Sequence, residues 1–489
     1  MDVPKPMMAD FPYGRMPLFL LAWVGLAATG FSASARTFHS AEGKPLKATF
    51  EGMAGDKVKL RREDGKTFEL ALEKLSAADQ TFIKEAAASA GNESKKLNAA
   101  AGQEIADGSP FATRKAEELA AALKLRPESR SRYGASWRLY AAFAKDYRLF
   151  GAMPYSVALY SDAAGLVTSL SIVYANKGDF GSTAGFGADH FNGGTDASAG
   201  SLTEAMAKDE ESVSKALTSA LGEGKTQRYG EGDTRRKITR WDWNGHAFLL
   251  SNEENEYVGL SIVSTESADA GGKSLRVKDG DVKQRLLDSI VKSDNGDVYL
   301  SEIPMVDQGP KGYCVPATFE RAMRTMGLEA DMYLLAMVGQ SNAGGGTSVE
   351  LLLQNVRSQV YRKGRRTKDD NLKQLRIRDL RRYLDQGIPV MWTMLSVAEY
   401  NKIADANTTK RASVKDWKAY AEEIKTEAAS ITKAPKPDDK HHICMIIGYN
   451  EATQEIAVSD SWGARFERRW VPVSVADWAS QGGVFMILP

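Results

Sequence analysis

The sequence predicts a multidomain protein of the α+β class. The chain has 489 residues and is too long for a single hydrophobic core. A usual domain length of roughly 100 to 200 residues predicts about three domains. Residues 36–86 alternate apolar and polar positions, which is typical of a small β unit. Residues 298–489 carry helical patterns first and strand patterns last, an order that indicates a layered α+β domain.

Composition and charge exclude several classes of protein. Apolar residues make up 43% and charged residues 26% of the chain, which fits neither wholesale disorder nor a polytopic membrane protein. The formal net charge of +1 gives no bias toward nucleic acid or anionic lipid. Cys314 and Cys444 are the only cysteines, so the chain has no disulfide framework.

The first 35 residues predict a secretory signal sequence. Arg15 precedes the apolar run MPLFLLAWVGLAATGF, and Ala33 and Ala35 occupy the small-residue positions of a signal-peptidase site. We therefore expect an exported protein, periplasmic or secreted. Two alternatives stay open: translation begins at Met16, or the apolar run stays uncleaved as a membrane anchor, although it is short for a span of about 20 residues.

Residues 36–86 predict strands followed by a short helix. Asp64 and Gly65 give a tight-turn signal, and Ser76 is the expected N-cap with Asp79 in the capping-box position. The opening Arg-Thr-aromatic, this turn and the closing LEKLSAADQ resemble SLA1 homology domain 1. The resemblance implies a small SH3-like β-barrel that docks a protein partner; a bland spacer or wall-facing module is the alternative.

The next two segments are predicted to be a linker and an α+β domain of unknown role. Residues 87–112 are rich in Ala, Gly, Ser and charge, with no apolar periodicity beyond a weak helix, which favours a linker. Residues 113–297 show strand patterns such as YSVALYS and a hairpin that turns at Asn244 and Gly245. The domain carries no catalytic constellation. We interpret four of its side chains as packing or loop residues rather than ligand contacts: His190, Trp241, Trp243 and His246.

Cys314 is the candidate nucleophile of the chain. A cysteine attacks as thiolate, and a helix N-terminus together with a neighbouring imidazole lowers its pKa. Pro316 suits a first helical turn, and ATFERAMRTMG continues with helix formers to a glycine. These residues predict a helix that begins at or beside Cys314.

Five histidines are available as the base for that thiol: His39, His190, His246, His441 and His442. The last two begin the predicted strand HHICMIIGYN, where successive side chains point to opposite faces, so only one of them can face the cysteine. We choose His442 because it shares a face with Cys444 and stands nearest the continuous apolar run. His441 is then a solvent-facing neighbour.

Asp460 and Gln308 complete the predicted site. Asp460 follows a short apolar run in VSDSWG, where a carboxylate would fix the imidazole tautomer and stabilise the imidazolium. Gln308 lies in a predicted loop six residues before Cys314. Its amide N–H, together with the backbone N–H of Cys314, would surround a developing oxyanion.

This order, with DQGPKGYCVPATFERAM, HHICMIIGY and VSDSWG as landmarks, resembles the papain-like peptidases, most closely the C39-like family of bacterial cysteine peptidases. The resemblance covers residues 298–489. It implies that Cys314 is the nucleophile, His442 the general base, Asp460 the orienting carboxylate and Gln308 the oxyanion donor.

The match to that family has two departures. Many relatives have Gly directly after the nucleophile, whereas this chain has Val315, which would narrow the cleft. Bacteriocin-processing members are fused to transporters and cut after double glycine. This chain shows no transporter segment, so that substrate is not carried over.

Blander interpretations of single residues stay open. A lone cysteine such as Cys314 is usually a small buried hydrophobe, and Cys444 is expected to be one. A redox-sensitive bond between the two cysteines is a minor alternative. The basic run from Arg362 to Arg382 would either bind an acidic partner or, as the near-zero net charge favours, form a solvated helical face.

The sequence therefore predicts an exported cysteine peptidase that hydrolyses peptide or protein substrates through a Cys-His-Asp triad. No metal or organic cofactor is expected, because the cysteines and scattered histidines lack zinc spacing. No nucleic-acid partner and no membrane span after signal cleavage are expected. One alternative is a non-catalytic binding scaffold with a degenerate peptidase fold, and another is an acyl transferase or amidase that uses the same triad.

Overall fold

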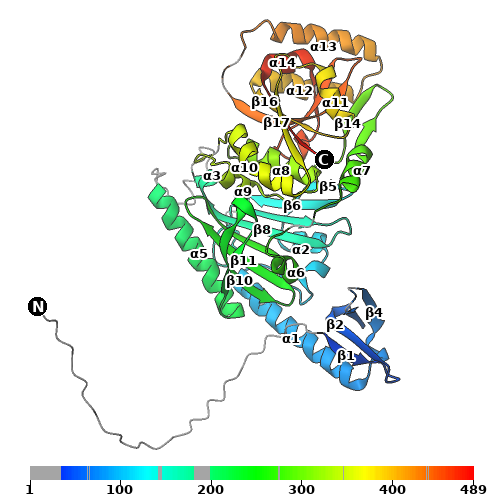
Figure 1. The fold of residues 1–489 in the computed structure, drawn as a ribbon, viewed down its shortest axis with the longest axis vertical. Helices are drawn as coiled ribbons and strands as arrows, with labels where there is room; N and C mark the ends of the chain where they lie inside the picture. Colours follow the sequence, from blue (N-terminus) through cyan, green and yellow to red (C-terminus); the bar gives the residue numbers. More distant parts are fainter. Residues whose placement is uncertain are drawn as a thin grey trace, which may run out of the picture.

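The computed structural model describes residues 35–489 apart from residues 55, 63, 65, 141–145, 181–198, 274–275, 345, 437 and 439. The predicted signal sequence, except for Ala35, and His190 lie outside the described residues. Within them, three sheets and their helices form a mixed α+β architecture with an N-terminal, a middle and a C-terminal unit (Figure 1). No helix in this part of the chain is both long enough and apolar enough to cross a membrane.

The N-terminal unit is an open antiparallel sheet rather than a barrel. Its strands pair in chain order: β1 (Arg36–His39), β2 (Pro45–Ala54), β3 (Lys57–Arg62) and β4 (Thr67–Ala71). The prediction of a closed SH3-like barrel is wrong for the described residues, since β1 and β4 stay at opposite edges. Helix α1 (Ala77–Ala101) covers the sheet instead, because Ile83 completes a core with Phe38 and Leu60.

Helix α1 replaces most of the predicted linker. It begins at the predicted N-cap, where the Ser76 hydroxyl accepts from the backbone N–H of Asp79 at 3.2 Å, and it runs on to Ala101. Its Ala-rich second half has high helix propensity, and Leu97 and Ala101 pack into the core of the middle unit. Only a few residues of this half pack into the other unit, so the sequence shows no apolar periodicity there.

The middle unit is built on one antiparallel sheet of eight strands in the order β5-β6-β7-β8-β12-β11-β10-β9. The predicted hairpin is confirmed: Asn244 and Gly245 connect β10 and β11 with φ values of 41° and 75°. Trp241, Trp243 and His246 are buried, in keeping with their interpretation as packing residues. The strands are β5 (Arg126–Ser131), β6 (Gly134–Tyr140), β7 (Ser156–Ser161), β8 (Val167–Asn176), β9 (Lys225–Tyr229), β10 (Arg236–Trp243), β11 (His246–Glu253) and β12 (Tyr257–Ser264).

Helices cover this sheet and connect its strands. Helix α5 packs against β8 and β11 and is seen along one side of the sheet in Figure 1. The short helix α3 directly follows β8 and carries Asp179. The helices are α2 (Ala116–Ala122), α3 (Lys177–Phe180), α5 (Ala199–Leu221) and α6 (Thr265–Asp269).

The C-terminal unit has a second large sheet, of order β13-β14-β17-β16-β20-β15, to which β18 and β19 add at β17. Strand β13 precedes residue 298 and strand β14 spans it, so the sheet begins before the predicted domain boundary. The strands are β13 (Ile290–Lys292), β14 (Asp297–Leu300), β15 (Arg366–Asn371), β16 (Val390–Leu395), β17 (His441–Asn450), β18 (Glu455–Ser459), β19 (Arg469–Pro472) and β20 (Ser480–Leu488).

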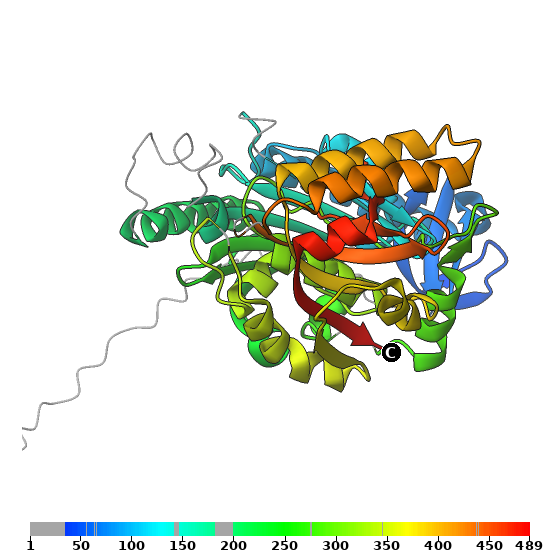
Figure 2. The same cartoon turned by 90° about the horizontal axis from the view of Figure 1, so that it is seen from above.

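Helices enclose this second sheet. Helix α8 packs against β17 in the main core, and two further helices, α12 and α13, lie between β16 and β17 in the sequence. Lys410 links these two helices through Glu423 and Glu427, and Figure 2 shows the helices side by side. The helices are α7 (Asp279–Asp288), α8 (Cys314–Thr325), α9 (Met332–Val338), α10 (Val349–Arg362), α11 (Ile377–Leu384), α12 (Ala398–Arg411), α13 (Trp417–Ile431) and α14 (Val473–Ala479).

Candidate active site

Cys314 is the first residue of α8, with Tyr313 as the N-cap. The helix has every residue from 315 to 323 buried, so the fold holds its N-terminus rigidly against β17. The Cys314 thiol is half-buried, and the backbone N–H groups of Val315 and Ile443 donate toward its sulfur. Unpaired N–H groups and the helix dipole both favour a negative charge at this position.

His442 brings an imidazole to that thiol from β17. The alternation along the strand is as predicted: His441 is exposed and contacts Gln481, whereas the His442 side chain is 6% exposed and hydrogen-bonded to Cys314. The Nε2 atom of His442 lies 3.0 Å from Oδ1 of Asp460. This contact leaves Nδ1 as the ring nitrogen for the thiol.

Asp460 follows β18 and is fully buried. Its second oxygen, Oδ2, accepts from Nη2 and Nε of Arg469 at 2.8 and 3.3 Å. Arg469 is itself buried on β19 and also donates to Asn401 and Asp405 of α12. The carboxylate is therefore held between an imidazole and a guanidinium.

These contacts shift the pKa values of the three groups in complementary directions. Burial lowers the pKa of His442, but its hydrogen bonds with Asp460 and Cys314 outweigh burial and raise the pKa to about 9. Burial raises the pKa of Cys314, but its hydrogen bond and charge interaction with His442 leave the pKa below the usual value. Burial likewise opposes the ionised Asp460, yet His442 and Arg469 lower its pKa. The arrangement favours a thiolate–imidazolium pair at neutral pH.

Two further side chains, which were not predicted from the sequence, lie around Cys314, His442 and Asp460. The ring of Trp462 stacks on the imidazole of His442 with centroids 4.6 Å apart, which fixes the ring plane and excludes water from one face. Arg321, two turns along α8 from Cys314, is fully buried and donates to the carbonyl and the hydroxyl of Ser459. It joins α8 to the strand end that presents Asp460.

Gln308 lies in the loop before α8, buried and close to the end of β18. Its backbone N–H donates to the Ser461 carbonyl at 2.9 Å, and its side-chain Nε2 donates to the Lys311 carbonyl at 3.0 Å. The structure therefore ties the Gln308 loop to the Asp460 strand end. One amide hydrogen of Gln308 is used within the loop, which leaves the second for another acceptor.

Cys444 takes no part in this group of side chains. It is fully buried in the main core, opposite Trp392 of β16, and burial raises its pKa well above the usual value. Both cysteines are free. The pKa of one thiol is therefore lowered and that of the other is raised, which makes Cys444 a suitable control for Cys314.

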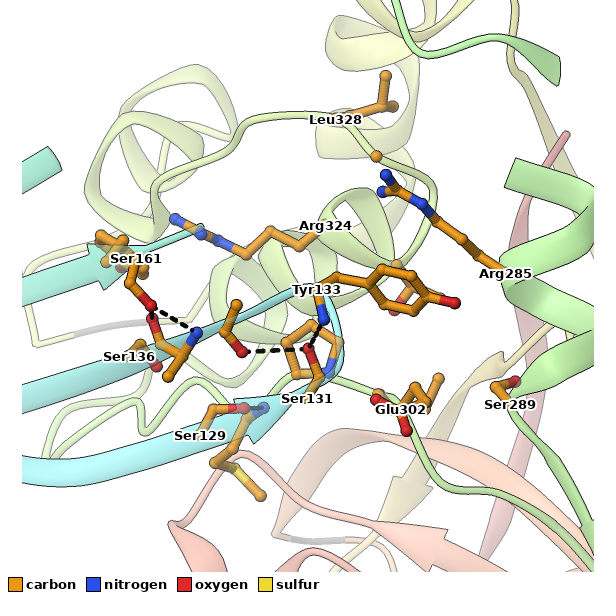
Figure 3. Close-up of a pocket in the computed structure, with 18 of the residues that line it drawn as sticks. Ser129, Ser131, Tyr133, Ser136, Ser161, Arg285, Ser289, Glu302, Arg324 and Leu328 are labelled. Carbon is orange, nitrogen blue, oxygen red and sulfur yellow. Dashed lines mark hydrogen bonds between the residues drawn. The ribbon is translucent and has the colours of Figure 1, made fainter. Parts of the chain in front are cut away.

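A cavity of about 230 Å³ lies elsewhere, at the seam between the middle and C-terminal units (Figure 3). Figure 3 shows serine side chains of the middle sheet, with Arg324 extending toward Ser161 and Arg285 on the opposite side. The Arg285 guanidinium lies over the Tyr133 ring, 4.6 Å from its centroid. The residues that line the cavity include none of the triad. Within the described residues, no three His, Cys, Asp or Glu side chains gather as a metal site would require.

Residues 300–484 match the sequence model of the Peptidase_C39 like family. The matched segment extends from β14 into β20 and contains Gln308, Cys314, His442 and Asp460. No curated protein matches the chain. The C-terminal unit is therefore similar to a peptidase family, whereas the N-terminal and middle units lie outside the match.

Proposed function

We propose that the C-terminal unit is a cysteine peptidase and that Cys314 is its nucleophile. The observation that carries the proposal is the hydrogen-bonded set Cys314, His442 and Asp460 at the N-terminus of a buried helix. The match of this unit to the Peptidase_C39 like family supports the same reaction class.

In the proposed reaction, the Cys314 thiolate attacks the carbonyl carbon of a peptide bond and forms a C–S bond. The carbonyl π electrons move to oxygen, and the intermediate collapses with cleavage of the C–N bond. The His442 imidazolium gives its proton to the leaving amine. Neutral His442 then takes a proton from water, which hydrolyses the thioester and releases the thiolate.

The oxyanion of the intermediate would lie near the helix start. The backbone N–H of Cys314 belongs to the first turn of α8, where intrahelical acceptors are lacking. The free amide hydrogen of Gln308 is the second donor that we propose. Both donors are fixed before substrate binds, which is the condition for strong transition-state stabilisation.

The buried charges favour catalysis over a binding scaffold. Burying His442, Asp460 and Arg469 together costs desolvation that a peptide-binding surface does not require. Groups whose pKa values are shifted by specific partners gather at catalytic sites more often than elsewhere. An acyl transferase with the same triad would pass the acyl group to an added amine in place of water, and product analysis with such an amine separates the two reactions.

Hydrolysis of fluorescently labelled casein tests the proposal. We expect residues 36–489 to cut it and one equivalent of iodoacetamide to abolish cleavage, with the adduct on a Cys314 peptide by mass spectrometry. Cys444 is the control thiol, since it is fully buried and should stay unmodified in the folded protein. Cleavage that survives complete alkylation of Cys314 would exclude this thiol as the nucleophile.

We also propose that the protein is exported, either periplasmic or secreted. Arg15, the apolar run and Ala35 support this placement. We expect a mature chain that begins at Arg36 and is recovered outside the cytoplasm, as measured by the intact mass of each cell fraction. A chain that keeps residues 1–35 in the cytoplasm would contradict export.

The N-terminal unit is proposed to dock a protein partner, on the strength of its resemblance to SLA1 homology domain 1. Its sheet is anchored on α1, whose second half packs into the middle unit. A partner bound to this sheet would therefore be connected to the middle unit through a helix rather than through a loose linker. Deletion of residues 36–75 should weaken recruitment to a partner without affecting casein hydrolysis; unchanged recruitment would exclude this role.

A further inference from the structure

Lys311 is a buried cation three residues before Cys314. Its Nζ lies 3.3 and 3.2 Å from the two carboxylate oxygens of Asp179, whose side chain is 3% exposed. Asp179 belongs to α3 of the middle unit, immediately after β8. A buried ion pair therefore joins the middle unit to the nucleophile loop.

Aromatic rings enclose the Lys311 ammonium. Its Nζ lies 4.8 Å from the ring centroid of Tyr140 in the middle unit, and 5.4 and 5.0 Å from those of Tyr313 and Tyr333 in the C-terminal unit. Burial lowers the pKa of Lys311, and Asp179 opposes that fall. The rings exclude water and stabilise the cation by their quadrupoles.

Stability alone does not account for this pair. Two buried charges recover their desolvation cost only with good geometry, and an apolar pair of similar size is often at least as stable. Among the described residues, Lys311 is the only ion-pair partner of Asp179. Each charge therefore specifies the position of the other, since any other placement leaves both unpaired in the interior.

Hydrogen bonds to the backbone of Lys311 connect its position to the proposed oxyanion site. Its carbonyl oxygen accepts from Nε2 of Gln308 at 3.0 Å and from the backbone N–H of Tyr313 at 2.9 Å. These two donors belong to the proposed oxyanion donor and to the residue directly before Cys314. A shift of Lys311 would therefore move both halves of the oxyanion site.

The middle unit also contacts the same loop elsewhere. The Asp307 backbone N–H donates to the Glu128 carboxylate at 2.9 Å, and the Tyr140 hydroxyl donates to the Asp307 carbonyl. Gly178, next to Asp179, packs so closely on the Tyr313 ring that an added Cβ would lie 2.4 Å from it. The loop is thus shaped by a surface of the middle unit.

We propose that Asp179 and Lys311 are positioning residues, and that the middle unit is a permanent part of the active site. The inference rests on the proposed peptidase function. It assigns a role to a residue outside the segment that matches the Peptidase_C39 like family. The pair holds the loop that carries Gln308 and leads into Cys314.

The test uses the full mature chain with Lys311→Met, Asp179→Asn and the double variant. Lys363→Met is the matched control, because Lys363 forms another ion pair between the same two units, 2.9 Å from Glu231. The measurements are amide hydrogen exchange of residues 307–315, kcat and KM for labelled casein, and the pH dependence of Cys314 alkylation. Thermal unfolding shows which variants fold.

We expect hydrogen exchange of residues 307–315 to rise about tenfold in all three variants, including the double variant, which buries no unpaired charge. We expect kcat to fall about 10- to 100-fold while KM stays within about threefold, since small displacements of catalytic donors have effects of this size. Cys314 alkylation should keep its acid limb, because Lys311 does not touch His442. The Lys363→Met control should match the wild type.

A double variant with wild-type loop exchange and wild-type kcat would overturn the inference, since packing alone would then place the loop. Faster exchange with unchanged kcat would overturn it as well. The outcome is separable from the peptidase proposal. If the wild type neither cuts casein nor shows an acid limb, the peptidase proposal and this catalytic role fall together. If the wild type does both, any failure belongs to the ion pair alone.

Discussion

Replacing Cys314 with alanine is expected to lower the rate of casein hydrolysis by about 10⁴-fold or more, because no other group can form the covalent intermediate. The substitution removes one sulfur atom from a half-buried position, so the fold should be retained. Initial rates under saturating substrate measure the effect, and thermal unfolding verifies the fold.

Cys444→Ala is the matched control for that variant. Cys444 lies in the main core, so its truncation should cost stability of about 1 kcal/mol or more and leave kcat unchanged. A Cys314→Ala protein that keeps its activity would refute the peptidase proposal and favour the binding scaffold. Loss of activity in Cys444→Ala at full folding would show that the two thiols act together.

The second large effect is expected for Arg469→Met, which should lower the free energy of unfolding by about 3–5 kcal/mol. Arg469 is 2% exposed and neutralises Asp460 and Asp405, so its removal leaves a fully buried carboxylate with His442 as its remaining charged partner. The Asp460 pKa should rise as a result. Urea unfolding at pH 7 measures the change, and casein hydrolysis should fall with it.

Arg465→Met provides the control for this stability effect. Arg465 also approaches Asp405, at 3.8 Å, but its side chain is 78% exposed. Its removal should change the free energy of unfolding by no more than about 0.5 kcal/mol. Adding Asp460→Asn to Arg469→Met should restore part of the lost stability, because both buried charges are then gone. Equal stability of the two single arginine variants would contradict this account of Arg469.

Cys314 and His442 could be singled out from the sequence because each depends on a local pattern. A proline and helix formers mark the helix start at Cys314, and strand alternation separates His442 from His441. Arg469 could not be predicted as part of the site, because the sequence RRW does not indicate which of the two arginines points into the protein. The pairing of Arg469 with Val458 across β18 and β19 decides this, and Arg468 instead lies over Tyr299.

The fold was predicted least well where tertiary contacts override local preference. Strand β15, with the sequence RTKDDN, is polar and exposed, and only pairing with β20 makes it a strand. The second half of α1 was expected as a linker, because its packing on the middle unit through Leu97 leaves no apolar periodicity in the sequence. Asp179 could not be connected with Lys311 by any spacing, because the two residues lie 132 positions apart in the sequence. Residues whose role follows from a local sequence pattern could be predicted, but the contacts that distant segments make with them could not.

The most direct test of the central claim is the rate of Cys314 alkylation by iodoacetamide as a function of pH, in the wild type and in His442→Ala. His442 has its pKa raised to about 9 and Cys314 has its pKa lowered, and both shifts favour a thiolate–imidazolium pair. We predict a wild-type rate that stays high below pH 7. In His442→Ala, the rate should rise only near the usual thiol pKa of about 8.5. Identical curves that rise near that pH in both proteins would show that Cys314 is an ordinary thiol and would contradict the account.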